Sequence, residues 1–253
     1  MAKQHLIYQV AVGEVPRYYG CCIDSVARYA TRIGADHIVQ REPILKIAPL
    51  ASQRSENALR LGYLPIYEKE NAFSYLGEYE KVAIIDADVY VRDSAPNVFD
   101  EYDTPFAGVV ERDLPATRKY RDKLVKHSRG QFSTLKDVDW RWNEGGAEFY
   151  NMGVMLLSDS LLEYLDETPE KFIRRPEFER FVNGEGHWKW STDQTLLNYW
   201  LKRADIACTR LDWRYNALYG AVSDVSGAYF VHFFLSAKLP RGGAEIPEII
   251  GKL

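Results

Sequence analysis

The sequence contains few cysteines, and they are not arranged as a disulfide framework or a zinc site. Only three of the 253 residues are cysteine. Cys21 and Cys22 are adjacent and cannot easily pair with each other, while Cys208 lies far away in the chain. No Cys-x-x-Cys pair and no Cys/His spacing typical of zinc ligands occurs. We therefore expect a reduced, cytoplasmic protein.

Long apolar runs are missing as well. The apolar run Leu6–Val10 is too short and too mixed for a signal peptide or a membrane span. We therefore expect no transmembrane segment, although this expectation leaves contact with a membrane surface open.

A strong excess of charge of either sign is also absent. The 32 basic and 36 acidic residues give a net charge of −4, so no global nucleic-acid footprint exists and we expect no nucleic-acid partner. Apolar residues make up 46% and aromatic residues 13%, which is typical of a globular protein with a sizeable core. No internal repeat, low-complexity tract or linker divides the sequence, so we expect a single domain over 1–253.

Expected strands and helices alternate along the chain. Over 19–33, for example, apolar residues recur at helical spacing and Gly34 follows as a stop. Such alternation favours an α/β fold with a largely parallel sheet, in which ligands collect at the carboxyl ends of the strands. The expected strands are 6–12, 37–40, a run ending at 86, 106–110, 154–157 and 231–234, and the expected helices are 19–33, 52–64, 68–76, a segment through 161–165, and 191–204.

Two carboxylates end one of these strands. The run from Lys81 to Val89 changes abruptly from apolar residues to Asp86-Ala87-Asp88. Residues two apart on an extended chain point to the same side, so these carboxylates repel each other unless a cation lies between them. Oxygen ligands of this kind suit Mg²⁺ or Mn²⁺, usually with substrate phosphates completing the coordination. A solvated acidic turn is the simpler alternative.

One segment departs from the average composition. Between Arg112 and Arg129 there are seven Lys or Arg residues and His127, against only Asp113 and Asp122. A solvated helical face is the simplest interpretation. The alternatives are a mobile basic lid, a surface for an acidic acceptor, or a region of peripheral membrane contact.

Four further polar clusters occur later, each with an ordinary structural explanation. Asn151 and Gly153 precede an apolar run and fit a polar turn. Ser191 and Gln194 have the spacing of a capping box, and Asp193 suits the dipole of the helix that follows. The other two clusters are the aromatic and polar segment 211–216, and the strand end at His232 with Lys238 six residues later.

Taken together, these clusters resemble the retaining glycosyltransferases of family 8, including glycogenin-like and bacterial galactosyltransferase-like enzymes. The resemblance extends from the first strand to about residue 238. That family usually has a glycine three residues after its closing histidine and Pro-Trp after its lysine, whereas this sequence has Leu235 and Leu239-Pro240. The matching motifs are the strand and Asp-x-Asp at 81–89, Asn-x-Gly-Val at 151–154, Asp-Gln at 193–194, the loop ending in aromatic-Asn at 211–216, and His-x5-Lys at 232–238.

The resemblance implies a GT-A nucleotide-diphospho-sugar transferase fold in one Rossmann-like domain. Its nucleotide-binding part would cover about 1–110 and its acceptor part about 111–253. It implies a nucleotide-sugar donor, commonly a UDP-hexose, with Mn²⁺ or Mg²⁺, and transfer to an acceptor hydroxyl with retention of configuration. The acceptor is not implied: a glycan, a lipid-linked sugar, a protein and a small molecule all stay open.

The resemblance also implies roles for individual residues. Asp86, Asp88 and His232 would ligate the metal. The catalytic set would comprise Asn151 and Asp193, which hold sugar hydroxyls, and Gln194, which lies under the anomeric carbon. The donor-binding set would comprise Lys238 at the diphosphate, Lys69 (with Arg60 as the competing candidate), Tyr8, Val10 and Ala11 around the base and ribose, and Asp86, Ala87, Asp88 and Gly153 near the phosphates and sugar.

Two other functional classes compete with this interpretation. A haloacid-dehalogenase-type phosphatase also has an apolar strand ending in Asp-x-Asp, with the first residue, here Asp86, as nucleophile. Such an enzyme needs a late acidic pair after another strand, but Asp224 stands alone. An inactive nucleotide- or glycan-binding module is the other alternative, and the intact set Asp86, Asp88, Asp193 and His232 argues against it.

Overall fold

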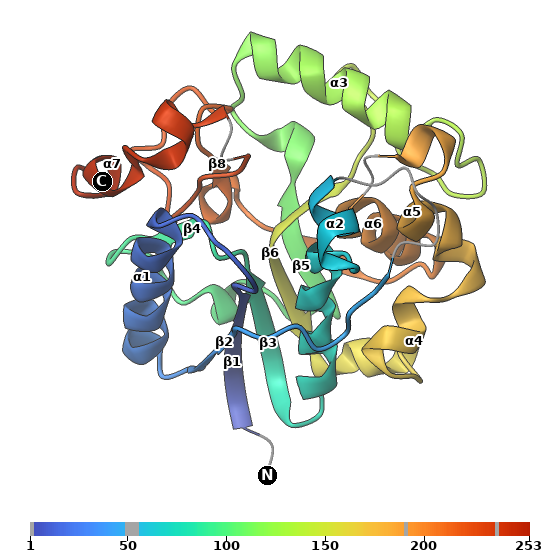
Figure 1. Ribbon diagram of the computed structural model, residues 1–253, viewed down its shortest axis with the longest axis horizontal. Coiled ribbons are helices and arrows are strands. Elements are labelled where there is room, and N and C mark those ends of the chain that lie inside the picture. Colours follow the sequence, from blue (N-terminus) through green and yellow to red (C-terminus); the bar gives the residue numbers. More distant parts are fainter. Residues whose placement is uncertain (1–2, 49–55, 190–191, 236–237) are drawn as a thin grey trace.

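A six-stranded sheet forms the centre of the protein (Figure 1). The structure is a computed structural model that describes residues 3–48, 56–189, 192–235 and 238–253. The strand order is β2-β1-β3-β6-β5-β7, and all pairs are parallel except those made by β6, which is antiparallel to both neighbours. The expectation of a mixed, mostly parallel α/β sheet is therefore confirmed. Its strands are β1 (Lys3–Val10), β2 (Asp36–Gln40), β3 (Tyr79–Ile85), β5 (Phe106–Val110), β6 (Tyr150–Ser158) and β7 (Cys208–Arg210).

A second, three-stranded sheet has the order β4-β9-β8. It consists of β4 (Val89–Val91), β8 (Ala217–Leu218) and β9 (Phe230–His232). Of these strands only β9 was expected from the sequence, and it ends at His232 instead of continuing to 234. Short strands such as β4 and β8 have too few residues to show a period-two pattern. This sheet joins the chain just after Asp88 to a segment near its other end.

Helices cover both faces of the central sheet (Figure 1). The predicted helix 19–33 is observed as α1, while the predicted helix 68–76 is part of a 3-10 helix, Pro65–Tyr75. Of the predicted helix 52–64, residues 52–55 lie outside the described residues. The α-helices are α1 (Tyr18–Ile33), α2 (Glu56–Leu61), α3 (Arg118–Phe132), α4 (Pro169–Ile173), α5 (Glu179–Asn183), α6 (Asp193–Arg203) and α7 (Ile246–Ile250).

The central strands are buried on both sides over most of their length, which explains why β3 is apolar from Val82 to Ile85. Tyr8 and Ile84 point into a core that they share with α4 and α6, whereas Ala83 and Ile85 point into a second core shared with α1 and the small sheet. A strand covered on both faces needs apolar residues at every position. Asp86 follows directly where this cover ends.

The basic segment from Arg118 onward forms α3, which lies at the top of the molecule as drawn, whereas Arg112 precedes the helix and is paired with Glu148 (Figure 1). The helix buries only Leu124, Ser128, Gln131 and Phe132. Its Lys and Arg side chains are exposed, as expected for a solvated helical face. Within the described residues no helix is both long and apolar enough to cross a membrane, and all three cysteines are free.

Candidate active site

Asp86 is the first residue after β3, and a tight turn separates it from β4. The backbone N–H of Asp86 donates to the carbonyl oxygen of Gly153 (2.8 Å), and Val89 N–H donates to the carbonyl oxygen of Asp86 (3.0 Å). Strand β4 then pairs with β9 so that Val89 faces His232. The turn and the strand pair thus bring Asp86, Asp88 and His232 together.

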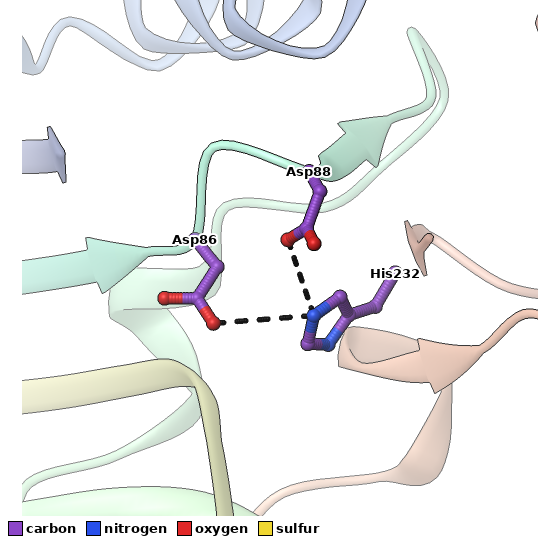
Figure 2. A group of neighbouring side chains, drawn as sticks. All are labelled: Asp86, Asp88 and His232. Atoms are coloured by element: carbon purple, nitrogen blue, oxygen red, sulfur yellow. Dashed lines mark ion pairs between the residues drawn. The ribbon is translucent and has the colours of Figure 1, made fainter. Parts of the chain in front are cut away.

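The side chains of these three residues form one cluster (Figure 2). Nε2 of His232 lies 3.2 Å from Oδ1 of Asp88 and 3.9 Å from Oδ2 of Asp86. One potential ligand atom from each residue lies within 4.8 Å of the others. Burial lowers the pKa of His232, but the carboxylates of Asp88 and Asp86 outweigh burial and raise it above its ordinary value. Two carboxylates and an imidazole are a donor set that suits Mn²⁺ or Mg²⁺, with the imidazole favouring Mn²⁺.

Hydrogen bonds behind the cluster orient the imidazole as a metal ligand requires. The backbone N–H of Gly153 donates to Oδ1 of Asn151 (3.0 Å), and Nδ2 of Asn216 donates to the same oxygen (2.8 Å). Oδ1 of Asn216 is therefore the atom that accepts from Nδ1 of His232, at 3.0 Å. A neutral imidazole with its proton on Nδ1 keeps its lone pair on Nε2, which faces the two carboxylates. The residues present thus fit a divalent cation.

Lys69 links this cluster to another carboxylate. Its Nζ atom donates to Oδ1 of Asp86 (2.9 Å) and to the carbonyl oxygen of Met152 (2.8 Å), and it lies 2.9 Å from Oδ2 of Asp193. Burial lowers the pKa of Lys69, but the charges of Asp193 and Asp86 outweigh burial and raise it. The buried ammonium group therefore stays charged and holds two like charges close together.

Asp193 and Gln194 are the first two residues of α6. The side chain of Thr192 caps this helix by accepting from Gln194 N–H (3.2 Å), and the predicted cap, Ser191, lies outside the described residues. Asp193 is only 2% exposed, and its burial raises the pKa although Lys69 opposes this. Oε1 of Gln194 accepts from Met152 N–H at 3.4 Å. Lys69 and Met152 of β6 therefore connect the start of α6 to Asp86 at the end of β3.

A cavity of about 440 Å³ opens beside the cluster. Asp86, Asp88 and Lys69 form one wall, and Val10 and Ala11 at the end of β1 form another. Its size lies within the range of about 300–1,000 Å³ that is usual for small-molecule sites. The other lining residues are Val12, Glu14, Val15, Pro16, Tyr19, Pro65, Ile66 and Ala87.

Comparison with known proteins decides the fold. No protein-family model matches the sequence, and no curated protein sequence matches it. A crystal structure does match: a glycosyltransferase involved in the glycosylation of the major capsid of PBCV-1, at 17% identity and a TM-score of 0.57, over 99% of this chain and 100% of that chain. The fold is that of the GT-A glycosyltransferases.

Two further GT-A structures match at lower similarity. Mouse xyloside xylosyltransferase 1 in its apo form is 13% identical, with a TM-score of 0.48 over 95% of this chain and 100% of that chain. The galactosyltransferase LgtC, solved with donor and acceptor sugar analogs, is 15% identical, with a TM-score of 0.46 over 98% of this chain and 96% of that chain.

In this GT-A fold, only some of the residues expected to bind the base and ribose line the cavity. Val10 and Ala11 line it, but Tyr8 is 1% exposed and is not one of its lining residues. The hydroxyl of Tyr8 donates to Oε1 of Gln40 and accepts from Nδ2 of Asn71 (3.0 Å). Tyr8 therefore supports the end of β1 from inside the core.

Both polar atoms of the Asn151 amide contact neighbouring residues. Its Oδ1 accepts from Gly153 and Asn216, and its Nδ2 donates to Oε2 of Glu111 (3.1 Å). Asn151 is 8% exposed. These contacts place it behind His232, and its expected contact with sugar hydroxyls stays a prediction.

The two remaining basic candidates lie outside the cavity beside Asp88. Arg60 is exposed on α2. Lys238 is also exposed and lines a different cavity. Leu235 has a φ of +57°, the left-handed conformation that glycine adopts most easily. The chain therefore keeps the backbone conformation suited to the family's usual glycine at this position, although the residue is leucine.

Sequence reasoning missed three residues that build the site. In the sequence, Asn216 is only the last residue of the 211–216 loop motif, and Glu111 and Glu70 belong to no motif. Glu70 is 1% exposed, and neither of its carboxylate oxygens has a hydrogen-bond partner among the described residues. Burial first, and the charge of Asp193 second, raise the pKa of Glu70 well above its ordinary value. Nothing in the local sequence distinguishes these residues from solvated ones.

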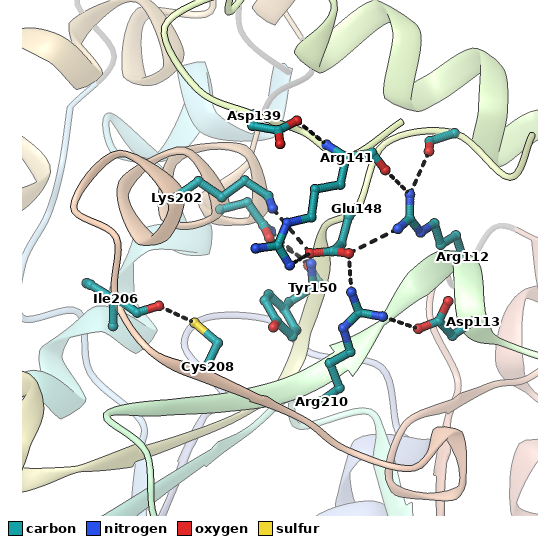
Figure 3. A network of polar contacts seen from close by, with 12 residues as sticks. Arg112, Asp113, Asp139, Arg141, Glu148, Tyr150, Lys202, Ile206, Cys208 and Arg210 are labelled. Carbon is teal, nitrogen blue, oxygen red and sulfur yellow. Dashed lines mark hydrogen bonds and ion pairs between the residues drawn. The ribbon is translucent and has the colours of Figure 1, made fainter. Parts of the chain in front are cut away.

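A separate ionic network surrounds Glu148, just before β6 (Figure 3). Four cations from different parts of the chain approach this one buried carboxylate. Oε2 accepts from Arg112 (3.0 Å) and from Arg210, while Lys202 and Arg141 lie 3.4 and 3.5 Å from Oε1. The network ties the start of β6 to α6 and β7, so we assign it a structural role.

Proposed function

We propose that this protein is a metal-dependent glycosyltransferase that moves a hexose from a nucleotide-sugar, a UDP-sugar, to an acceptor hydroxyl with retention of configuration. One observation carries the proposal: Asp86, Asp88 and His232 form a cluster beside a cavity that the two aspartates line. Lys69 links Asp86 of this cluster to Asp193. The GT-A fold supports it. The phosphatase and the inactive binding module are less consistent with this arrangement.

Cleavage of a sugar–diphosphate bond needs stabilisation of the negative charge that grows on the leaving group. A divalent cation held by Asp86, Asp88 and His232 would supply that stabilisation as a Lewis acid. Asn216 holds His232 in the tautomer that presents Nε2. Asp86 contributes one oxygen to this cluster while its other oxygen accepts from Lys69, which fixes the orientation of the carboxylate.

The sugar needs stabilisation by negative charge, because positive charge develops on its anomeric carbon. The carboxylate of Asp193 and the amide oxygen of Gln194 are electron-rich groups at the start of one helix, close to Lys69. Lys69 keeps Asp193 from repelling Asp86, because it contacts both. We propose that these two residues face the sugar while Val10 and Ala11 contact the base and ribose.

A donor screen tests this function. UDP-, GDP- and CDP-hexoses are incubated with the protein and Mn²⁺, and nucleoside diphosphate release is measured with and without chelator. We expect release from UDP-sugars that stops on chelation and falls by orders of magnitude in Asp88→Asn, because the cluster loses a charge. The matched control is Asp93→Asn, an exposed aspartate after β4 that should behave as wild type.

Other outcomes decide between the remaining functional classes. Phosphate release from simple phosphomonoesters, without nucleoside diphosphate release, would establish a phosphatase. Thermal stabilisation by UDP without any turnover would establish a binding module. Full Mn²⁺-dependent activity of Asp88→Asn would contradict the metal assignment.

A further inference from the structure

A second cavity, of about 570 Å³, lies near His232, because Phe234, two residues further along the chain, lines it. It lies between the start of α3 and the C-terminal segment, two regions drawn close together at the top of Figure 1. The two cavities share no lining residue. The second cavity is lined by Thr117, Lys119, Tyr120, Lys123, Tyr219, Gly220, Phe234, Lys238, Leu239 and Pro240.

The charge in this second cavity is of one sign. Lys119, Lys123 and Lys238 line it, and no acidic side chain is among its described lining residues. Across the described part of the chain, none of these lysines forms a salt bridge. Three uncompensated ammonium groups around one concave site create a positive potential that attracts an anion.

The start of α3 adds to this potential. The helix has 15 residues, and its cap, Thr117, also lines the cavity. The side chain of Thr117 accepts from Tyr120 N–H, which leaves the N–H groups of Arg118 and Lys119 at the helix end without a capping side chain. Backbone N–H groups and the helix dipole at this end favour negative charge.

Aromatic rings complete the walls of the cavity and connect it to the metal cluster. Tyr120 packs edge-on against Phe234, with ring centroids 6.0 Å apart, and Phe234 in turn lies 5.8 Å from the ring of His232. The hydroxyl of Tyr120 donates to Glu111, which holds Asn151 behind the same histidine. The cavity is therefore connected through Phe234 to the candidate catalytic centre, and its aromatic faces suit a sugar ring.

We propose that this cavity is the acceptor subsite and that it binds a phosphorylated sugar. The inference rests on the proposed transferase function, which needs an acceptor close to the metal cluster. Lys119, Lys123 and the helix start would hold the phosphate, and the rings of Tyr120, Tyr219 and Phe234 would hold the sugar. A concave site with aromatic walls favours a sugar phosphate over a flat membrane surface, which offers no ring to hold.

The test measures binding of glucose 6-phosphate and of glucose by calorimetry, without donor. We expect glucose 6-phosphate to bind and glucose to bind at least about tenfold more weakly, because each charged hydrogen bond to the phosphate strengthens binding by about tenfold or more. The double variant Lys119→Ala/Lys123→Ala should lose about tenfold or more in affinity for the same reason. Neither lysine belongs to the expected donor site, so donor hydrolysis should stay at the wild-type rate.

A matched control separates a local site from the general field of the helix. Lys126→Ala/Arg129→Ala removes the same charge from the same helix, outside the cavity. This variant should bind glucose 6-phosphate within about twofold of wild type, because neither side chain lines the cavity and solvent and salt screen exposed charges. Equal weakening in both variants, or equal binding of glucose and glucose 6-phosphate, would overturn the proposal.

Two further measurements keep the outcomes apart. The first is sedimentation with phosphatidylglycerol vesicles. If both variants bind the vesicles equally weakly and the protein does not bind glucose 6-phosphate, α3 contacts a membrane surface and the acceptor subsite is overturned. Absence of nucleoside diphosphate release from every donor would refute the transferase function, whatever the result with glucose 6-phosphate.

Discussion

The imidazole of His232 lies directly against the backbone of Gly153. A Cβ atom at position 153 would come within 2.3 Å of Cε1 and 2.5 Å of Nδ1 of that ring. No real Cβ contact is that short, so the ring must move if residue 153 has a side chain. A glycine in β6 thus makes room for the imidazole from β9, and the two residues act as one unit.

Gly153→Ala should therefore displace His232 and weaken the metal site. We expect Mn²⁺ affinity to fall by about 10- to 100-fold, the usual cost of disturbing a residue that orients a metal ligand. The measurement is Mn²⁺ titration followed by electron paramagnetic resonance, together with donor hydrolysis at saturating metal. Gly20→Ala is the control, because a Cβ atom at that position in α1 meets nothing within 4 Å. Unchanged Mn²⁺ affinity in Gly153→Ala would show that His232 is not a ligand.

Mn²⁺ affinity should also depend on pH through His232. Its pKa lies above the ordinary 6.5 because Asp88 and Asp86 outweigh burial, so the metal-free protein carries a proton that Mn²⁺ must displace. Below this pKa, affinity should fall by about tenfold for each pH unit. Calorimetry in buffers of different ionisation enthalpy should record proton release on binding, and His232→Gln should abolish the release.

The metal-free protein should show the opposite trend in stability. The folded pKa of His232 is raised, so its contribution to stability is fully present below the unfolded pKa of about 6.5 and is lost as the pH rises through the folded pKa. Denaturant titrations in chelator on both sides of this range check the sign. A metal-free protein whose His232 contribution grows with rising pH, judged against His232→Gln, would contradict it.

Glu148→Gln should destabilise the fold strongly. The substitution leaves Arg112 and Lys202 as buried cations without the carboxylate that compensates them, with side-chain exposures of only 8% and 14%. Removing one partner of a buried ionic group costs about 3–5 kcal/mol. Urea unfolding measures the difference. Glu170→Gln breaks the exposed pair with Arg174 and should cost less than about 0.5 kcal/mol; similar losses in the two variants would mean that the network contributes little.

Leu235→Gly should stabilise the protein. Leu235 has a φ of +57° and is 52% exposed, so glycine removes an unfavourable backbone conformation and little buried surface. The gain in unfolding free energy should be about 0.5–1 kcal/mol, since the left-handed conformation costs about 1–2 kcal/mol and the extra flexibility of glycine offsets part of it. Leu59→Gly, an exposed leucine within α2, should instead cost about 1 kcal/mol. Thermal unfolding compares the two, and destabilisation by Leu235→Gly would show that the leucine packs in solution.

Sequence reasoning succeeded where a residue's role follows from its neighbours along the chain. The apolar run of β3 must be buried, so the charges of Asp86 and Asp88 had to lie at its exposed end. The helical spacing of α1 and its stop at Gly34 were confirmed for the same reason. The 3-10 helix Pro65–Tyr75, in contrast, was expected as part of an ordinary helix, because the apolar pattern does not separate the two types.

The sequence by itself determined the alternation of strands and helices and the carboxylate pair at the end of β3, because local hydrophobic patterns decide burial. Only the tertiary structure decided which other residues contact or support that carboxylate pair. Lys69 forms ion pairs with Asp86 and Asp193, and Asn151 lies behind His232, because strands distant in sequence pair in one register. The tautomer of His232 depends on a backbone N–H of β6 and a side chain from the 211–216 loop. Such contacts between distant segments leave no periodic pattern in the sequence.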